Sequence, residues 1–492
     1  METRRRPNLL FLYTDEQRFD TLQAYGNEHI QMPSLNRLAE DSHVFRHAYV
    51  TQAVCTPSRS SLLTGLWPHQ TGVVNNNIPL PENAACVPEL LANGLDEEPP
   101  VSGHIGKWHL GDEIYCQHGF NDWHGTEDTY YAFYGADRDA LKDRSSYDRW
   151  LRGHGVEPVN WVSGVPGIGE HVEFVDRFTR EQISALPEHL GRPAFLAEKA
   201  ESFIQTHREE QFVLYVNFLE PHMPFHGPRD NQYDPGSVTL PPDFCLPPPE
   251  VLSVREAEKA QRYWEHGFEH HTLRTEQERR RLLARYWGLC SQVDTAVGRI
   301  IEALHASGLY DDTIIVFTSD HGDMMGGHGL IAKSVQYEGS VRVPLLIKEV
   351  GQSSQYVHDA PVSHIDIVPT LLDFMEAPIP DGLPGTSLRS SASTREPGLA
   401  PRGDAVFVEW NPPPRNASRG TSGESIRTVV TPEGWKLNWS SAGDHQLFNL
   451  KTDPGEFDNL YRSRPEISTA CMDRIKQWQS ETDDPIVLPE IG

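Results

Sequence analysis

Short apolar runs separated by amphipathic helical segments constrain the fold of this chain more than any other feature. Asn8–Tyr13, Phe212–Leu219 and Thr313–Thr318 are apolar runs of the kind that forms strands buried on both faces of a parallel sheet. Pro33–Glu40 begins with proline at the first position of an expected helix, and Glu276–Ser307 keeps a helical period of apolar residues over its whole length. This order of strands and helices predicts an α/β protein in which helices sandwich a large, mostly parallel, mixed sheet.

The last hundred residues have a different pattern. Four short strands separated by turn residues are expected there, and a helix near Glu466–Trp478 follows them; the strands are Ala405–Trp410, Ile426–Thr431, Trp435–Trp439 and Gln446–Leu450. We therefore predict a catalytic α/β domain over residues 1–385, with long insertions at about 125–195 and 228–260. A smaller subdomain over 400–492 is expected to contain a four-stranded antiparallel sheet and a helix.

Composition excludes several classes of function. The 492 residues include 70 acidic and 43 basic ones, and the net charge of −27 disfavours a nucleic acid or an anionic membrane as partner. No apolar run approaches the roughly 18 residues that a membrane-spanning helix needs. The N-terminus shows no signal peptide, so we expect a cytoplasmic protein, although a secreted or periplasmic protein trimmed of its signal would look the same. Six scattered cysteines without a C-x-x-C pair argue against a disulfide framework or a zinc ribbon.

One cysteine stands in an unusual setting. Cys55 comes just before Pro57, which suits the first turn of a helix running through Leu63, and Arg59 follows one turn later. A helix N-terminus beside an arginine stabilises an anion or an anionic nucleophile, whereas a buried structural cysteine is the alternative for such a position. A thiol phosphatase would need arginine six places after the cysteine, and that place holds Ser61.

Acidic residues follow two of the apolar runs. Asp15 and Glu16 come after the first, and Asp320 and His321 after Thr313–Thr318, at the strand ends where α/β sheets place ligands. A single such pair would more often be a loop or a helix cap, but two pairs and the cysteine segment together indicate a site. Three carboxylates and one imidazole suit a hard divalent cation, with Ca²⁺ favoured by the number of oxygens, Mn²⁺ compatible through His321, and Mg²⁺ an alternative.

Four motifs, in the same order along nearly the whole chain, resemble those of the sulfatase family within the alkaline-phosphatase superfamily. They are Cys55-x-Pro-Ser-Arg59 followed by Leu-Leu-Thr-Gly65, Gly106-Lys-Trp-His-Leu110, Thr318-Ser-Asp-His-Gly-Asp323, and Asp453-Pro-Gly-Glu-Phe-Asp-Asn459. The resemblance implies an alkaline-phosphatase-like fold. It also implies that a formylglycine-generating enzyme oxidises Cys55 to formylglycine, whose hydrate is the nucleophile.

The same resemblance assigns roles to the other motif residues. The metal ligands would be Asp15, Glu16, Asp320, His321 and an oxygen of the modified Cys55, and Glu16 departs from the aspartate or amide more frequent at its position. Arg59 would orient the nucleophile. Lys107 and His109 would contact formylglycine and substrate oxygens, with His109 as the candidate base. His222 would be the candidate general acid for the leaving alcohol, and Lys333 would bind a sulfate oxygen.

Other polar and aromatic residues are interpreted more simply. A loop, a turn or packing of the insertion explains them at least as well as a role in the site; they are His328, Asn75–Asn77, Trp123, His124 and Tyr130–Tyr134. Asn416 and Asn438 begin glycosylation sequons, which matter only in a secreted protein.

The leading hypothesis is a sulfuric ester hydrolase that depends on formylglycine and a divalent metal. Its substrate is expected to be a small sulfated carbohydrate fragment, by family prevalence and not by any residue. A phosphonate monoester or phosphodiester hydrolase with the same machinery is the alternative, which Lys107 and His109 disfavour because such relatives tend to lack the lysine. An inactive sulfate- or glycan-binding relative would be expected to lack Arg59 or a metal carboxylate, and both are present. An unmodified cysteine enzyme has no base placed to support it. The oligomeric state stays open.

Overall fold

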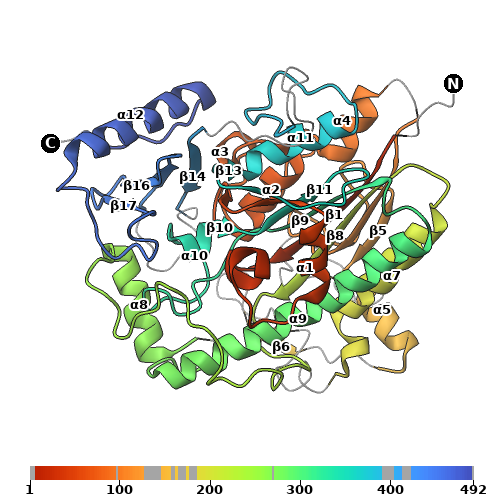
Figure 1. Ribbon diagram of the computed structural model, residues 1–492, viewed down its shortest axis with the longest axis horizontal. Helices are drawn as coiled ribbons and strands as arrows, with labels where there is room; N and C mark the ends of the chain where they lie inside the picture. The colour runs from red at the N-terminus through yellow and green to blue at the C-terminus, as the bar shows by residue number, and fades with distance from the viewer. Residues whose placement is uncertain are drawn as a thin grey trace.

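The computed structural model describes residues 6–95, 98–126, 146–156, 161–164, 173–176, 186–268, 271–389, 404–412 and 423–489. A large sheet with helices on both faces forms most of the molecule, and a small sheet with the C-terminal helix lies to one side of it (Figure 1). The predicted α/β class, with its separate antiparallel sheet, is confirmed.

The large sheet has eight strands in the order β12-β2-β11-β9-β1-β8-β4-β5. Strands β9, β1, β8, β4 and β5 are mutually parallel, and β11 is antiparallel to β9 and β2. Their bounds are β1 Asn8–Asp15, β2 His43–Phe45, β4 Val101–Gly106, β5 Asp122–Gly125, β8 Phe212–Pro221, β9 Thr313–Ser319, β11 Leu345–Lys348 and β12 Tyr356–His358. The three apolar runs identified in the sequence are therefore three central strands, β9, β1 and β8, which are neighbours in space although they are far apart along the chain.

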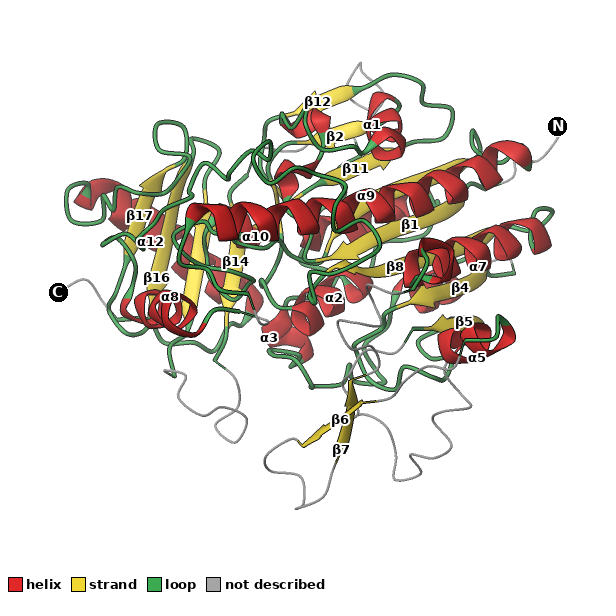
Figure 2. Ribbon diagram, turned by 90° about the horizontal axis from the view of Figure 1, so that it is seen from below, coloured by secondary structure: helices red, strands yellow, loops and turns green. Residues whose placement is uncertain are grey.

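Two helical layers cover this sheet, and alternate residues of β1 face each of them. Leu10 and Leu12 pack in a core with α1 (Pro33–Glu40), α7 (Arg192–Thr206) and α9 (Glu276–Ala306). Leu9, Phe11 and Tyr13 pack in a second core with α2 (Cys55–Thr64), α4 (Val87–Gly94) and α11 (Ile367–Phe374). Figure 2 shows α7 and α9 crossing one face of the strands. Burial on both faces explains why β1 is apolar throughout and does not alternate with polar residues.

The small sheet follows the antiparallel order β14-β15-β16-β17. Its strands are β14 Val406–Trp410, β15 Ile426–Val430, β16 Trp435–Ser440 and β17 Gln446–Asn449, and α12 (Pro465–Thr482) packs on it through Cys471, Met472 and Ile475. The backbone N–H of Glu409 donates to the Thr51 carbonyl at 2.7 Å, and Val54 packs against Trp410 and Ile426. The small sheet thus supports the segment that leads directly into α2.

Shorter elements complete the described part of the chain. A three-stranded sheet joins β10 (Arg342–Val343), β3 (Ala48–Tyr49) and β13 (Val362–Ser363), and a two-stranded one joins β6 (Trp161–Gly164) and β7 (Glu173–Asp176). The remaining α-helices are α3 Pro68–Thr71, α5 Ser146–Gly153, α8 Val254–His266 and α10 Glu338–Val341. Single 3₁₀ turns cover Phe19–Thr21, Gln23–Tyr25, Glu188–Leu190 and His364–Asp366.

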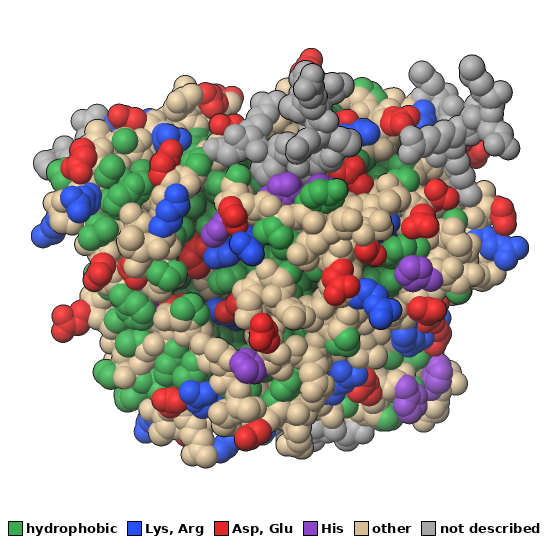
Figure 3. Space-filling model, in the orientation of Figure 1, with side chains coloured by type: hydrophobic (Ala, Val, Ile, Leu, Met, Phe, Trp, Pro, Cys, Tyr) green, Lys and Arg blue, Asp and Glu red, His purple; other side chains and the backbone are tan. Residues whose placement is uncertain are grey.

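Two further features of the molecule are the distribution of its surface charge and the apolar character of its helices. Acidic and basic side chains are interspersed on the face drawn in Figure 3, so the excess negative charge is not gathered into one patch on this face. Within the described ranges, no helix combines the length and the apolar character needed to cross a membrane.

Candidate active site

The carboxyl ends of β1 and β9 meet at one point of the sheet and bring two acidic segments together. Thr14 is paired with Ser319, and the Asp320 N–H donates to the Thr14 carbonyl at 3.0 Å. In return the Glu16 N–H donates to Asp320 Oδ1 at 3.1 Å, and Glu16 adopts a left-handed φ of 70°. Asp15, Glu16, Asp320 and His321 are all fully buried. The parallel pairing of the two strands therefore places four predicted ligands in one buried cluster.

Helix α2 places Cys55 against this cluster. The helix begins at Cys55 itself, and the Asn76 side chain accepts the N–H of Thr56 at 3.1 Å. Cys55 Sγ lies 3.3 Å from His321 Nε2 and 3.8 Å from Asp15 Oδ1.

Arg59, one turn further along α2, holds two carboxylates in place. Its Nε donates to Asp320 Oδ2 at 2.8 Å and one terminal nitrogen donates to Asp15 Oδ2 at 3.0 Å. The other terminal nitrogen donates to the Lys107 carbonyl at 2.9 Å, and the guanidinium lies 4.9 Å from the centre of the Tyr13 ring. Arg59 is fully buried, so the planar group fixes three strand ends with directional bonds.

Two lysines reach the same cluster from different loops. Lys107, directly after β4, places Nζ 2.7 Å from Asp15 Oδ2. Lys333 places Nζ 3.5 Å from Glu16 Oε1 and 3.9 Å from Asp15 Oδ1, and its side chain is 13% exposed. Burial raises the pKa of Asp15, but the positive charge of Lys107 and the other cations outweighs burial and holds this pKa well below its usual value. Asp15 is therefore ionised.

The two predicted catalytic histidines are neutral in this setting. His222 Nδ1 donates to the Met223 carbonyl at 2.7 Å, which leaves Nε2 facing Glu16 Oε2 at 3.6 Å. Burial and then Lys333 hold the pKa of His222 well below 6.5. His109 is fully buried, and burial, Lys107 and Arg59 keep its pKa well below 6.5 as well. Both imidazoles can accept a proton at neutral pH.

The donor set of the cluster fits a divalent cation. Ligand atoms of Asp15, Cys55, Asp320 and His321 lie within 4.8 Å of one another, as do those of Asp15, Glu16 and His222. Both carboxylate oxygens of Glu16 are buried and form no hydrogen bond with any described residue. Burial raises the pKa of Glu16 well above its usual value. Such buried carboxylate oxygens are stabilised by a cation, and oxygen donors with one imidazole suit Ca²⁺ or Mn²⁺.

The thiol of Cys55 differs from the sequence-based expectation of an anionic nucleophile. Burial, and then the negative charge of Asp15, raise the pKa of Cys55 to about 11. These two effects outweigh the positive charges of Lys333 and Lys107, which lower this pKa. The thiol is therefore protonated at neutral pH, which argues against an unmodified cysteine enzyme.

Comparison with known proteins identifies the family. A model of the sulfatase family matches residues 7–377, and a model described as N-sulphoglucosamine sulphohydrolase, C-terminal, matches residues 326–481. The chain belongs to the sulfatase family. It is 28% identical over 487 residues to an arylsulfatase of Clostridium perfringens, covering 93% of this chain and 91% of that protein.

Solved structures share the fold of this sulfatase. A phosphonate monoester hydrolase from Silicibacter pomeroyi has a TM-score of 0.76 at 21% identity, covering 97% of this chain and 96% of that one. A second protein, solved in complex with its substrate D-glucosamine-2-N,6-O-disulfate, has a TM-score of 0.70 at 20% identity, covering 98% and 99%. At these identities the likeness concerns the fold alone.

Sequence reasoning missed one residue of the sulfatase site, Glu113. Its buried carboxylate accepts the N–H groups of Trp108 at 3.2 Å and of His109 at 2.7 Å. His109 adopts a left-handed φ of 60°, a conformation that costs a residue with a side chain about 1–3 kcal/mol. Such a conformation persists only when surrounding contacts hold it, and the two hydrogen bonds to Glu113 are contacts of this kind. A single glutamate in a loop carries no sequence signal for this role.

Most of the residues that were interpreted as structural lie outside the site. His328 stacks on Tyr337 at 4.0 Å and its Nε2 contacts the Gly455 carbonyl at 2.9 Å. Trp123 stacks on His104 at 4.1 Å, as expected for packing. Asn438 is buried and bonded to Thr428, which leaves no room for a glycan. Tyr130–Tyr134, Asn416 and most of the insertion at 125–195 lie outside the described residues, whereas the end of the insertion at 228–260 begins α8.

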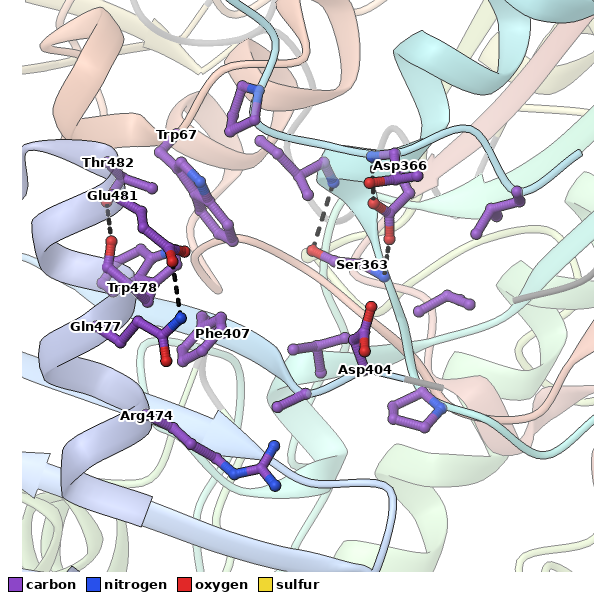
Figure 4. Close-up of a pocket in the computed structure, with 18 of the residues that line it drawn as sticks. Trp67, Ser363, Asp366, Asp404, Phe407, Arg474, Gln477, Trp478, Glu481 and Thr482 are labelled. Carbon is purple, nitrogen blue, oxygen red and sulfur yellow. Dashed lines mark hydrogen bonds between the residues drawn. The ribbon is translucent and has the colours of Figure 1, made fainter. Parts of the chain in front are cut away.

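One sizeable cavity lies away from the cluster around Cys55. It measures about 490 Å³ and lies between α12 and the turn that carries Ser363 and Asp366, with Trp67, Phe407 and Trp478 on one side (Figure 4). Phe407 and Trp478 stack with ring centres 5.1 Å apart. None of the predicted catalytic or metal-binding residues lines this cavity.

Proposed function

We propose that this protein hydrolyses organic sulfate esters with a formylglycine made from Cys55 and one divalent metal ion, Ca²⁺ in the first instance. The observation that carries the proposal is the buried constellation in which Cys55 Sγ faces His321 and Asp15 while Arg59 joins Asp15 to Asp320. Cys55, Arg59, Asp320 and His321 belong to sulfatase motifs in the sequence, and Asp15 ends the strand β1 beside them. The enzyme that generates formylglycine would be the partner needed for maturation.

Asp15, Glu16, Asp320 and His321 would hold the metal together with an oxygen of the modified residue. When bound, the metal would withdraw charge from the sulfate oxygens and hold the hydrated aldehyde for attack on sulfur. His321 Nδ1 lies 2.9 Å from the Gly322 carbonyl, to which it donates. That bond fixes the tautomer and leaves Nε2, which faces Cys55 and both aspartates, free to ligate.

Three cations would orient the reactants. Lys333 is the one with measurable exposure, and its Nζ makes no hydrogen bond to a described residue, so it is placed to receive a sulfate oxygen. Lys107 lies against Asp15 and would contact the modified side chain and the ester together. Arg59 donates hydrogen bonds to Asp15 and Asp320, and it would therefore orient the nucleophile by fixing the residues around it.

Two neutral imidazoles would move protons. For His222 to protonate the leaving alcohol, Nε2 must carry a proton, because Nδ1 already donates to the Met223 carbonyl. A bound sulfate ester brings negative charge beside this ring and raises its pKa, which favours that protonated form in the complex. His109, kept neutral by burial and by its cationic neighbours, would accept the proton whose removal releases sulfate.

A sulfated carbohydrate is the proposed substrate class. The family model over residues 326–481 and the fold neighbour solved with a disulfated glucosamine support it. Hydrolysis of phosphonate monoesters or phosphodiesters is the second candidate, favoured by the fold likeness to a phosphonate monoester hydrolase. Lys107 and His109, both buried at the site, support sulfate instead.

Mass spectrometry of the peptide that carries Cys55, from protein made in its native host, tests the nucleophile. We expect a residue lighter than cysteine that reacts with aldehyde reagents, and an intact thiol in fully active protein would refute the mechanism. On the same preparation, kcat/KM for matched aryl sulfate and phosphonate esters decides between the two classes. A lower value for the sulfate ester would overturn the assignment, and Cys55→Ala gives the background rate for both.

A further inference from the structure

A cysteine, a glutamate and a histidine meet beside Trp108, outside the catalytic cluster. Cys86 immediately precedes α4, Glu89 lies in the first turn of this helix, and His118 lies in the loop before β5. One ligand atom from each of the three lies within 4.8 Å of the others. Cys86 is fully buried, and the side chains of His118 and Glu89 are 5% and 30% exposed.

The histidine is aimed into this cluster without a hydrogen bond. His118 Nδ1 lies 3.5 Å from Glu89 Oε2, is buried, and forms no hydrogen bond with any described residue. The N–H group of Cys86 donates to the same glutamate oxygen at 2.9 Å, which fixes the carboxylate in position. The thiol lies 4.0 Å from the Ala84 carbonyl. His118 Nδ1 therefore lies within ion-pair distance of the carboxylate but makes no hydrogen bond to it.

We propose that Cys86, Glu89 and His118 form a second metal site, for a borderline-soft divalent ion of the Zn²⁺ class. Thiolate, imidazole and carboxylate are the three ligand types that zinc takes, and bond lengths of roughly 2.0–2.3 Å put neighbouring tetrahedral ligands about 3.3–3.8 Å apart. The separation of 3.5 Å between His118 Nδ1 and Glu89 Oε2 matches that spacing. Three protein ligands leave the fourth position for water.

The surroundings provide access to the site and a reason for it. A surface hollow of about 330 Å³ is lined by Pro88, Glu89 and Gly119, so an ion can enter beside the glutamate. On the buried side the His118 ring packs against Trp108, with ring centres 5.8 Å apart. Trp108 stands between Lys107 and His109, and a metal that fixes His118 therefore braces the loop that carries both. The thiolate separates this site from the oxygen-rich catalytic one, which suits harder cations.

Cobalt spectroscopy tests the proposal in a Cys55→Ala background, where the catalytic cluster has no sulfur ligand. Chelator-treated protein is titrated with Co²⁺, and we expect a thiolate-to-cobalt charge-transfer band that saturates at one equivalent and disappears when Zn²⁺ is added. Cys86→Ser in this background should abolish the band, and His118→Gln should weaken Co²⁺ binding at least ten-fold. The exposed Cys116 provides the matched control, because Cys116→Ser should retain the band.

Three results would overturn the proposal. They are the absence of a charge-transfer band in the Cys55→Ala protein, a band that survives Cys86→Ser, and a band that Cys116→Ser removes. His118→Gln changes a loop side chain and keeps the assay informative if Cys86→Ser fails to fold. Because Cys55 is absent throughout, the outcome does not depend on the formylglycine mechanism.

Discussion

Replacing Glu113 with glutamine tests whether this residue positions the catalytic loop. The carboxylate accepts two backbone N–H groups, those of Trp108 and His109, and an amide of the same shape offers only one oxygen for the two. One N–H is then left buried without an acceptor, at a cost of about 1–3 kcal/mol. The left-handed φ of His109 stores a further ~1–3 kcal/mol, which the loop can release by moving.

The expected effect follows from the displacement of His109. A shift of about 1 Å in a catalytic group costs on the order of 100-fold in rate. We expect kcat for a sulfate ester to fall by roughly 30–100-fold in Glu113→Gln, equivalent to about 2–3 kcal/mol. KM should change by less than about three-fold, because Lys333 reaches the substrate from another loop. Glu113→Asp keeps the charge and should recover part of the rate.

The pH profile separates positioning from a general loss of stability. Burial, Lys107 and Arg59 lower the pKa of His109, so a ring that moves away from them has a higher pKa. The acid limb of kcat/KM should therefore shift to higher pH in Glu113→Gln. Glu201→Gln, which breaks a surface ion pair with Arg299, is the matched control and should leave rate and profile unchanged. A rate within three-fold of the wild type in folded Glu113→Gln would refute the reasoning.

Three further predictions concern the metal, the small sheet and the thiol. Chelation should lower sulfatase activity at least 100-fold, and adding Ca²⁺ or Mn²⁺ should restore it. Glu16→Gln should raise the metal concentration that gives half-maximal activity about ten-fold or more. Full activity after verified metal removal would contradict a metal-dependent mechanism. Lys436→Met should lower the free energy of unfolding by about 3–5 kcal/mol in denaturant titrations, because it leaves buried carboxyl groups without their cation. Lys436 Nζ lies 2.9 Å from Glu338 and 2.8 Å from Glu456, and both glutamates are buried. A change below about 1 kcal/mol would show that other groups stabilise these carboxylates. In protein made without the modifying enzyme, alkylation of Cys55 should be slow at neutral pH and accelerate toward its pKa of about 11, whereas a pH-independent rate would contradict a protonated thiol.

The central strands could be predicted from the sequence because both faces of the sheet are buried, so nearly every residue of these strands is apolar. Asn8–Tyr13 and Thr313–Thr318 were expected as strands, and the structure extends them to Asp15 and Ser319. Their extension is the part that matters for function, because Asp15 is still in the strand when it reaches the site. The strand order could not be read from the sequence, since pairing between β1 and β9 depends on packing of residues some three hundred positions apart.

The sequence motifs predicted which residues lie together at the site, but the residues next to each of them in the sequence did not predict their ionisation. A cysteine at a helix N-terminus indicates a stabilised anion, whereas complete burial and Asp15 reverse that expectation for Cys55. Glu113 and His118 were missed for a related reason. Their importance depends on what a loop folds against, and an isolated charged residue in a loop has no periodicity or spacing to reveal it.

The charges of the site explain how a protein of net charge −27 can bind an anionic substrate. Three buried carboxyl groups, Asp15, Glu16 and Asp320, face three cations, Arg59, Lys107 and Lys333. Burial raises the pKa of Glu16, and a bound cation would favour its ionised form, in which the formal charges of these six side chains cancel. Because the cluster is buried, its local field is screened less than the charges on the surface. A divalent cation held by the carboxylates would give this otherwise balanced cluster two positive charges, and a sulfate ester brings one negative charge. The carboxylates therefore serve anion binding: they hold the cation, and the three side-chain cations that balance them keep the combined site positive.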